Sequence, residues 1–485
     1  MEPARDRPGP GRNLLTPCAP LRRVKFGDLA VGPTPQLPLD AYLARRKSLA
    51  KQLGTGHVLV VATHTVKQYS NDVDYLYRPH SDFWYLTGFA EPGAVLVLQG
   101  GSGATTLFLR DRKKEAEIWT GRRLGVARAA AALGVDHAFD IAELATRLPA
   151  ALGKSMVHAI TDHDPGVRRL VRSAARRRWV KDPGTAKAGG PSSALLGKPK
   201  ANAPRDPHGR ELLHEMRLIK DAAELRMLRK ACDLGVEAHL AMAPRIQAGA
   251  QEFHVEADFA HHARHHGSTG VGYPSICGCG PNAAVLHYVS NLGALRAGEL
   301  FLVDAGCEWG YYTSDITRTY PVGGAFSPTQ HSFYELVLEA HQAALRQVRP
   351  GNPFRKPHEA AVETITAGLI DRGLIDGPFE KAIAEKRHQR FFMHGTSHWL
   401  GLDVHDTGGA TGLDGKPRLL REGMVLTVEP GLYFNRDFTA CPPGTAGIGI
   451  RIEDDVAVTA GGRSNLTRRL PVEPADVASL VSPRR

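Results

Sequence analysis

The sequence predicts two domains: an α/β domain on the N-terminal side and an α+β domain on the C-terminal side. The chain has 485 residues, more than the ~250–300 beyond which a single hydrophobic core stops growing. In its first third, short apolar strands alternate with helical patterns, which is typical of an α/β domain with a mixed sheet. Beyond residue 207, helices followed by strands occur twice in succession.

Four segments follow from the composition along the chain. Residues 1–36 are rich in Pro, Gly and Arg and lack periodicity, so we interpret them as a flexible basic tail. Residues 37–166 form the α/β domain. Residues 167–207 are basic and then rich in Pro, Gly, Ser and Ala, which predicts a linker or insertion. Residues 208–485 form the second domain.

The α/β domain opens with a predicted helix, Leu37–Leu53, whose apolar residues recur at helical spacing. His57–Thr63 reads HVLVVAT, a buried strand. Further strands are predicted at 94–98 and 105–109, a charged helix start at 115–125, and a helix at 127–133.

The second domain begins with a helix at Asp221. The Asp221 side chain can accept a hydrogen bond from the amide of Glu224, and the Glu224 side chain can accept one from the amide of Asp221. This reciprocal pair is a capping box. The next helix, Glu252–His265, ends before Gly267. Later helices are predicted at 330–347 and 358–372, and strands at 272–277, 285–288, 300–304, 311–319, 392–394, 397–402, 424–429 and 447–458.

Composition excludes several classes of function. No apolar run approaches the ~18 residues of a membrane span, and the N-terminal residues lack the apolar stretch of a secretory signal. The six scattered cysteines are typical of reduced thiols in a cytoplasm. The net charge is +11, but much of the excess lies in 168–220 with little aromatic interleaving, which favours a solvated segment over a nucleic-acid surface.

The most informative stretch is Val303–Thr319, VDAGCEWGYYTSDITRT, which predicts a hairpin. With Trp309–Gly310 as the turn, Asp304 lies opposite Asp315 on the same face. Cross-strand Cβ atoms are roughly 4.5–5.5 Å apart, and partly buried like charges at that distance cost several kcal/mol. A cation between the two carboxylates would offset this cost.

Further candidate ligands lie downstream. The segment FFMHGTSHWLGLDVHD carries three histidines, VLTVEPGLY places Glu429 at the end of an apolar strand, and in GIGIRIEDD Arg451 and Glu453 share one face. Two Asp, one His and two Glu carry too much charge for one ion and suit two divalent ions about 3.5–4 Å apart. Oxygen-rich ligation with one imidazole favours Mn²⁺, Co²⁺ or Zn²⁺.

These motifs, in this order, resemble the dinuclear metallopeptidases of the pita-bread fold, and within them the Xaa-Pro aminopeptidases. The resemblance runs from about residue 39 to 468, through both domains. It implies a pita-bread second domain and an N-terminal domain without metal ligands. It also implies two metal ions, with Mn²⁺ favoured, and assigns as ligands Asp304, Asp315, His398, Glu429 and Glu453.

The resemblance also implies a mechanism in which a metal-bridged hydroxide attacks the carbonyl before proline. Glu429 is the candidate for moving the proton to the leaving nitrogen. His287, His394 and His405 are assigned to the substrate and the tetrahedral intermediate. Arg451 shares the strand face of Glu453 and is expected to orient it or to neutralise the crowded carboxylates. Tyr433 is a candidate contact to the intermediate, and Thr313 and Thr317 to the ligands.

The imide nitrogen of Xaa-Pro carries no hydrogen, so ordinary aminopeptidases that need that N–H fail. A pocket that stacks the pyrrolidine ring of proline needs flat apolar walls. In related enzymes an aromatic residue from a neighbouring subunit contributes to these walls, and Trp84 in SDFWYLTGF is matched to it. We therefore expect a cytoplasmic homo-oligomer, a dimer or tetramer, that acts on peptides with Pro at position 2.

Three alternatives remain at this stage. A prolidase, which cleaves only Xaa-Pro dipeptides, uses the same metal ligands, although SHW and SDFWYLTGF resemble the aminopeptidases more. Methionine aminopeptidases generally lack the N-terminal domain. A non-catalytic pita-bread binding protein would fit the charge of +11, but all five ligand positions are intact.

Overall fold

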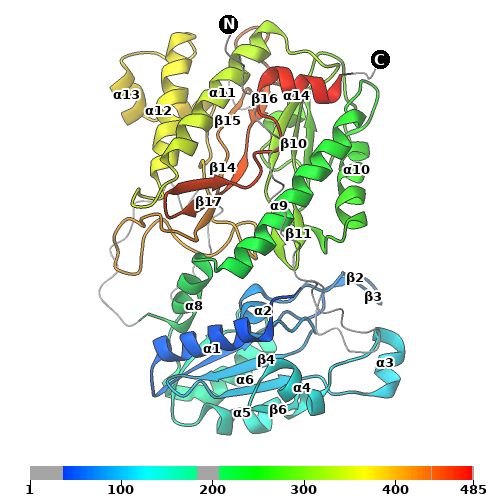
Figure 1. Cartoon of the computed structure of the whole chain (residues 1–485), viewed down its shortest axis with the longest axis vertical. Helices are drawn as coiled ribbons and strands as arrows, with labels where there is room; N and C mark the ends of the chain where they lie inside the picture. The colour runs from blue at the N-terminus through cyan, green and yellow to red at the C-terminus, as the bar shows by residue number, and fades with distance from the viewer. Residues whose placement is uncertain (1–35, 183–206, 438–439, 483–485) are drawn as a thin grey trace, which may run out of the picture.

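The computed structural model describes residues 36–182, 207–437 and 440–482. The predicted tail at 1–36 therefore lies almost entirely outside the described residues. Two bodies are visible in Figure 1: the blue-to-cyan N-terminal part below, and the green-to-red remainder above it. In the described part of the chain, no helix is both long and apolar enough to cross a membrane.

The N-terminal domain is built on one five-stranded sheet with the order β6-β5-β4-β1-β7. Antiparallel pairs join β1 to β4 and β4 to β5, whereas β1–β7 and β5–β6 are parallel. The predicted mixed α/β sheet is therefore confirmed. Its strands are β1 (His57–Ala62), β4 (Val95–Gln99), β5 (Thr105–Leu109), β6 (His137–Asp140) and β7 (Met156–Ile160).

Helices cover both faces of this sheet, so there is a hydrophobic core on each side. Alternate residues of β1 point into opposite cores. Leu59 and Val61 pack in one core, and Val58 and Val60 in the other. A short exposed hairpin, β2 (Gln68–Ser70) and β3 (Val73–Asp74), precedes α2. The helices are α1 (Leu39–Leu53), α2 (Ser81–Thr87), α3 (Lys114–Thr120), α4 (Val126–Leu133), α5 (Leu144–Leu152) and α6 (Pro165–Ala175).

The predicted domain boundary after residue 166 is wrong, because it falls inside α6. Val171 and Ala175 of α6 are buried against the sheet, and Val167 packs on the same core. Trp179 then forms a β-bridge with Val157 of β7. The basic composition of this segment hid a helix whose arginines face away from the core. The N-terminal domain extends to Asp182, and 183–206 of the predicted linker lie outside the described residues.

The second domain starts with α8 (Gly209–Leu218), α9 (Ala222–Met242) and α10 (Glu252–His265). The predicted capping box is confirmed, since the amide of Glu224 donates to Asp221 Oδ1 at 2.9 Å and the amide of Asp221 donates to Glu224 Oε2 at 3.1 Å. In Figure 1, α9 runs obliquely along the upper body beside α10. The strands that follow are β8 (Gly270–Val271), β9 (Ile276–Cys279), β10 (Leu300–Asp304), β11 (Cys307–Trp309), β12 (Tyr312–Thr313) and β13 (Thr317–Pro321).

The helices-then-strands order occurs a second time, as predicted. An isolated β-bridge between Thr317 and Glu453 joins the strands of the two halves. The second set comprises α11 (Pro328–Gln347), α12 (Lys356–Asp371), α13 (Phe379–Ala384), β14 (Val425–Val428), β15 (Gly431–Tyr433), β16 (Gly449–Arg451), β17 (Asp454–Thr459), β18 (Gly462–Asn465) and α14 (Pro474–Val481).

Three predicted strands are not strands. Residues 285–288, 392–394 and 397–402 are irregular, apart from a single bridge between Trp399 and Leu426. Irregular backbone lets side chains leave the strict alternation of a strand. In the last two segments this allows His394 and His398 to reach the same cavity.

Buried ion pairs join the two domains. Arg217 of α8 is 3% exposed and donates to Asp82 of α2 at 2.7 Å. The same guanidinium donates to Asp403 at 2.8 Å and to Asp406 at 2.5 Å. Arg78 of the N-terminal domain donates to the carbonyl of Leu402 at 2.5 Å. The loop that carries His405 is therefore held in place from the N-terminal domain.

Candidate metal centre

The structure brings Asp304 and Asp315 together, but not by the predicted register. The paired residues are Asp304 with Thr317 and Trp309 with Tyr312, so the turn is Gly310–Tyr311 rather than Trp309–Gly310. Both turn residues have positive φ, 59° and 68°, as a type I′ hairpin turn requires. Asp315 lies in the irregular stretch between β12 and β13.

A tyrosine that the sequence analysis missed connects the two carboxylates. The hydroxyl of Tyr273 lies 2.6 Å from Asp304 Oδ1 and 2.5 Å from Asp315 Oδ1. A phenol has one proton to donate, so one of these two short contacts needs another proton or a cation. Tyr273 stands in an irregular segment before β9, where no periodicity marks it in the sequence.

His398 and Glu429 enter the same cavity from the second half. His398 Nε2 lies 3.2 Å from Asp315 Oδ2 and 3.6 Å from Glu429 Oε1. His398 Nδ1 lies 3.1 Å from the carbonyl of Trp399, which fixes the proton on Nδ1 and leaves Nε2 with its lone pair. This is the hydrogen-bonding pattern of a metal-ligating histidine.

Glu453 and Arg451 complete the crowded group. The Thr317 hydroxyl donates to Glu453 Oε2 at 2.6 Å. Arg451 donates to Asp304 Oδ2 at 2.6 Å, to the Tyr433 hydroxyl at 2.8 Å and to Thr317 Oγ1 at 3.2 Å. Arg451 thus neutralises Asp304 directly and reaches Glu453 through Thr317. The other candidate, Thr313, bonds the carbonyl of Ser314 instead.

The electrostatics of the cavity favour bound cations. Burial raises the pKa of Asp315 well above its usual value, and the nearby Asp304 raises it further. Burial also raises the pKa of Glu429, with Glu453 adding to the shift, and that of Glu453, with Asp315 adding. Among the described residues that line the cavity, Arg451 is the one permanent cation. A donor set of four carboxylates and one imidazole around a single arginine therefore fits divalent ions.

Three more predicted site residues line this cavity, and Tyr433 contacts one of them. The cavity has a volume of about 80 Å³ and is lined by His287, His394 and His405 together with all five predicted ligands. His394 Nε2 lies 2.8 Å from the Tyr433 hydroxyl, and its Nδ1 lies 3.6 Å from Glu429 Oε2. Burial lowers the pKa of His394 to about 3 and, together with His287, lowers that of His405. The imidazoles of His394 and His405 are therefore neutral.

Asp455 is a second residue that the sequence analysis missed. Its Oδ2 accepts the backbone N–H of Asp315 at 3.0 Å and the thiol of Cys232 at 3.3 Å. Burial raises its pKa to about 8. Because Asp455 holds the backbone of Asp315, it sets the position of that carboxylate. Its place next to Asp454 in an acidic run gave the only signal in the sequence.

The structure contradicts the predicted role of Trp84. Its ring is 2% exposed and packs edge-on against Tyr42 of α1 and Tyr311 of the second domain. It therefore presents no surface to a neighbouring subunit. The exposed tryptophan of the N-terminal domain is Trp119 at the end of α3, which is 86% exposed.

Four carboxylates and one imidazole converge in one buried cavity. This donor set indicates that the protein belongs to the class of metal-dependent hydrolases. Comparison with protein families narrows the class. Residues 226–460 match metallopeptidase family M24, and residues 42–159 match the N-terminal domain of aminopeptidase P. The chain belongs to the Xaa-Pro aminopeptidases of family M24.

Relatives match over nearly their whole length. The Xaa-Pro aminopeptidase of Escherichia coli is 38% identical over 452 residues, which is 92% of this chain and 98% of the relative. The structure of zinc-substituted E. coli aminopeptidase P in complex with product superposes with a TM-score of 0.82 at 36% identity, over 92% and 98% of the two chains. Proline aminopeptidase P II from Yersinia pestis gives a TM-score of 0.81 at 38% identity, over 92% and 99%. The predicted pita-bread fold and family are confirmed.

Proposed function

We propose that this enzyme releases the N-terminal residue from peptides that carry proline in second position. The observation that supports this most strongly is the match to Xaa-Pro aminopeptidases through both domains. The convergence of all five predicted ligands in one cavity supports a working metal centre rather than a binding protein.

We propose that two divalent ions, Mn²⁺ being favoured, are held by Asp304, Asp315, His398, Glu429 and Glu453. Asp315, His398 and Glu453 offer ligand atoms within 4.8 Å of one another. Asp315 and Glu453 would each hold both ions. When bound, such ions lower the pKa of a water to near neutrality and polarise the scissile carbonyl.

The protein's own residues are proposed to position the substrate and to transfer a proton. Glu429 is the proposed proton carrier, since its carboxylate lies in the cavity with Oε2 3.6 Å from His394 Nδ1. His394 stands between Glu429 and Tyr433. His287 and His405 line the opening and are proposed to donate N–H bonds to the substrate. Arg451 pairs with Asp304 and donates a hydrogen bond to the Tyr433 hydroxyl.

We further propose a homo-oligomer in which an exposed aromatic residue of one subunit completes the proline pocket of another. The burial of Trp84 excludes it from that role. Trp119 and its neighbour Ile118, 86% and 80% exposed, are the apolar surface that such a contact would cover. Cytoplasmic location also remains a proposal.

The test compares hydrolysis of a tripeptide Xaa-Pro-Yaa with that of the dipeptide Xaa-Pro, with added Mn²⁺ and with chelator. We expect cleavage of the tripeptide before proline and loss of this activity on chelation. Cleavage of the dipeptide alone would move the assignment to prolidase, since the ligands of the two enzymes are the same. Absence of metal-dependent cleavage would refute the proposal.

A further inference from the structure

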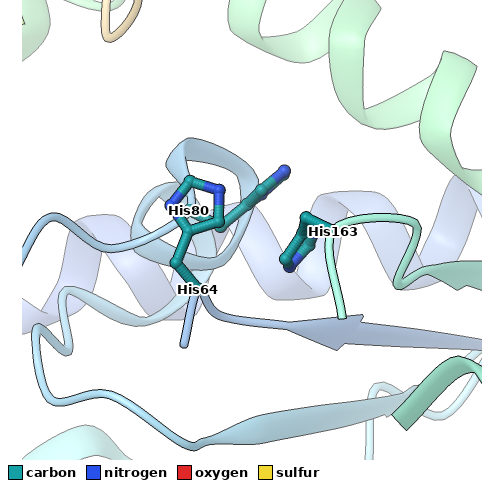
Figure 2. Close-up of side chains that lie close together, drawn as sticks. All are labelled: His64, His80 and His163. Carbon is teal, nitrogen blue, oxygen red and sulfur yellow. The ribbon is translucent and has the colours of Figure 1, made fainter. Parts of the chain in front are cut away.

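Three histidines meet in the N-terminal domain, in a different domain from the candidate metal centre. His64 follows β1, His80 precedes α2, and His163 follows β7. Figure 2 shows their rings gathered beside the end of a strand. The ring centroids of His64 lie 5.0 Å from His80 and 4.9 Å from His163, while His80 and His163 stack at 4.1 Å.

Hydrogen bonds already orient two of the rings. His163 Nε2 lies 3.0 Å from the carbonyl of Ala62, so its proton sits there and Nδ1 keeps its lone pair. That Nδ1 is buried and has no hydrogen-bond partner among the described residues. His64 Nδ1 lies 3.2 Å from the carbonyl of Arg78, which leaves Nε2 with its lone pair. A carbonyl that holds the second ring nitrogen is typical of metal-ligating histidine.

The third ring is held less tightly. His80 Nδ1 accepts the amide of Asp82 at a long 3.3 Å, as the cap of α2. Ligation through Nε2 requires the proton to move to Nδ1, so this cap bond is exchanged for the metal bond. All three rings are partly exposed, so an ion can enter from solvent.

The surroundings keep the rings in the form that binds metal. Burial lowers the pKa of His80 to about 3, and it also lowers the pKa of His64 and of His163. The rings are therefore neutral at pH 7. The carboxylates of Asp82 and Asp162 lie close enough to favour a cation, whereas Lys67, Arg78 and Arg210 oppose it.

We propose that His64, His80 and His163 form a transition-metal site that is separate from the catalytic centre. The three residues offer ligand atoms within 4.8 Å of one another. Tetrahedral zinc with Zn–N bonds of about 2.0–2.1 Å holds its nitrogens about 3.4 Å apart, so any two ligand atoms that lie farther apart than this must move together when the ion binds. Three imidazoles without a thiolate suit Zn²⁺, with Cu²⁺ and Ni²⁺ as the same chemical class.

An ion here would tie together the ends of β1 and β7 and the segment 78–82. That segment makes direct contacts with the second domain, since Arg78 bonds Leu402 and Ser81 bonds Asp403. The site would therefore stabilise the domain contact rather than take part in hydrolysis.

The test counts zinc on the full-length chain after equilibrium dialysis against Zn²⁺, by mass spectrometry of the metal. We expect the unsubstituted chain to bind one equivalent more than His163→Gln and than His64→Gln. Glutamine can still donate to Ala62 or to Arg78 but is a poor ligand. His137→Gln on β6 and His331→Gln on α11 are controls at exposed histidines and keep the full count.

Equal zinc content in the unsubstituted chain and in both site variants would overturn the proposal, as would an equal loss in the two controls. A second measurement uses no variant, so its result does not depend on whether a substituted chain folds. Crystals of the unsubstituted chain soaked in Zn²⁺ should show anomalous density at the zinc edge within about 2.1 Å of the three nitrogens. Density at the catalytic centre alone would refute the site and leave the proposed peptidase function untouched.

Discussion

Replacing Thr317 with Val tests how strongly one hydroxyl supports the metal centre. Thr317 is fully buried, donates to Glu453 at 2.6 Å and accepts from Arg451 at 3.2 Å. Valine has nearly the same shape, so packing is preserved while both hydrogen bonds are lost. Without the donor, ionised Glu453 is less stable in its buried position, and the metal must offset that cost.

The magnitude follows from the type of bond. A hydrogen bond to a charged group contributes roughly 1.5–3 kcal/mol, and 1.36 kcal/mol corresponds to a factor of ten. We therefore expect Thr317→Val to weaken Mn²⁺ binding about 10- to 100-fold, the range typical of such outer-shell partners. The assay is the Mn²⁺ concentration that restores half-maximal tripeptide hydrolysis to the chelated enzyme.

The matched control is Thr105→Val in the N-terminal domain. Thr105 is buried and its hydroxyl also bonds a carboxylate, donating to Asp136 at 2.8 Å. This variant should lose stability without a shift in the Mn²⁺ midpoint. A Thr317→Val enzyme with an unchanged midpoint would show that the hydroxyl does not support Glu453 as a ligand.

Three further predictions concern other parts of the molecule. Glu429→Gln should lower kcat sharply, and near-normal kcat with both metals bound, measured by metal analysis, would exclude Glu429 as the proton carrier. Asp455 has a pKa raised to about 8 in the folded state. Between about pH 4 and 8 the folded chain therefore binds more protons than the unfolded chain. The stability of the metal-free protein consequently falls as the pH rises through this window. Asp455→Asn keeps an acceptor for the amide of Asp315 and should flatten that fall in thermal unfolding of chelated protein, whereas an unchanged slope would assign it to other groups. Trp84→Ala should cost about 3–5 kcal/mol of stability, while Trp119→Ala should leave stability unchanged and reduce kcat/KM, and the reverse pattern would contradict the placement of the two rings.

Periodic patterns and caps predicted most of the fold, because they depend on local sequence. The helix Glu252–His265 and its capped predecessor at Asp221 are found where the sequence places them. The boundary at 166 failed because α6 is highly charged on its outer face, so composition masked its apolar stripe.

The metal-site motifs were predicted, but their hydrogen bonding was only partly visible in the sequence. Asp304 and Asp315 lie close together although the register differs by two and Asp315 stands outside the strands, and the Tyr273 hydroxyl contacts both carboxylates. Tyr273 and Asp455 were missed because each acts through contacts between segments far apart in the sequence. Trp84 was misplaced for a similar reason, since its motif says nothing about which domain covers the ring.

The Arg217 cluster has a consequence for any attempt to divide the chain. Its guanidinium is shared between Asp82 on one side and Asp403 and Asp406 on the other. A second domain expressed alone would lose one of these carboxylates, together with Arg78 and Ser81, and the loop bearing His405 would lose its anchors. Exchange of N-terminal domains between relatives would have to carry this set of residues as a unit. The position of the cavity wall that carries His405 therefore depends on both domains.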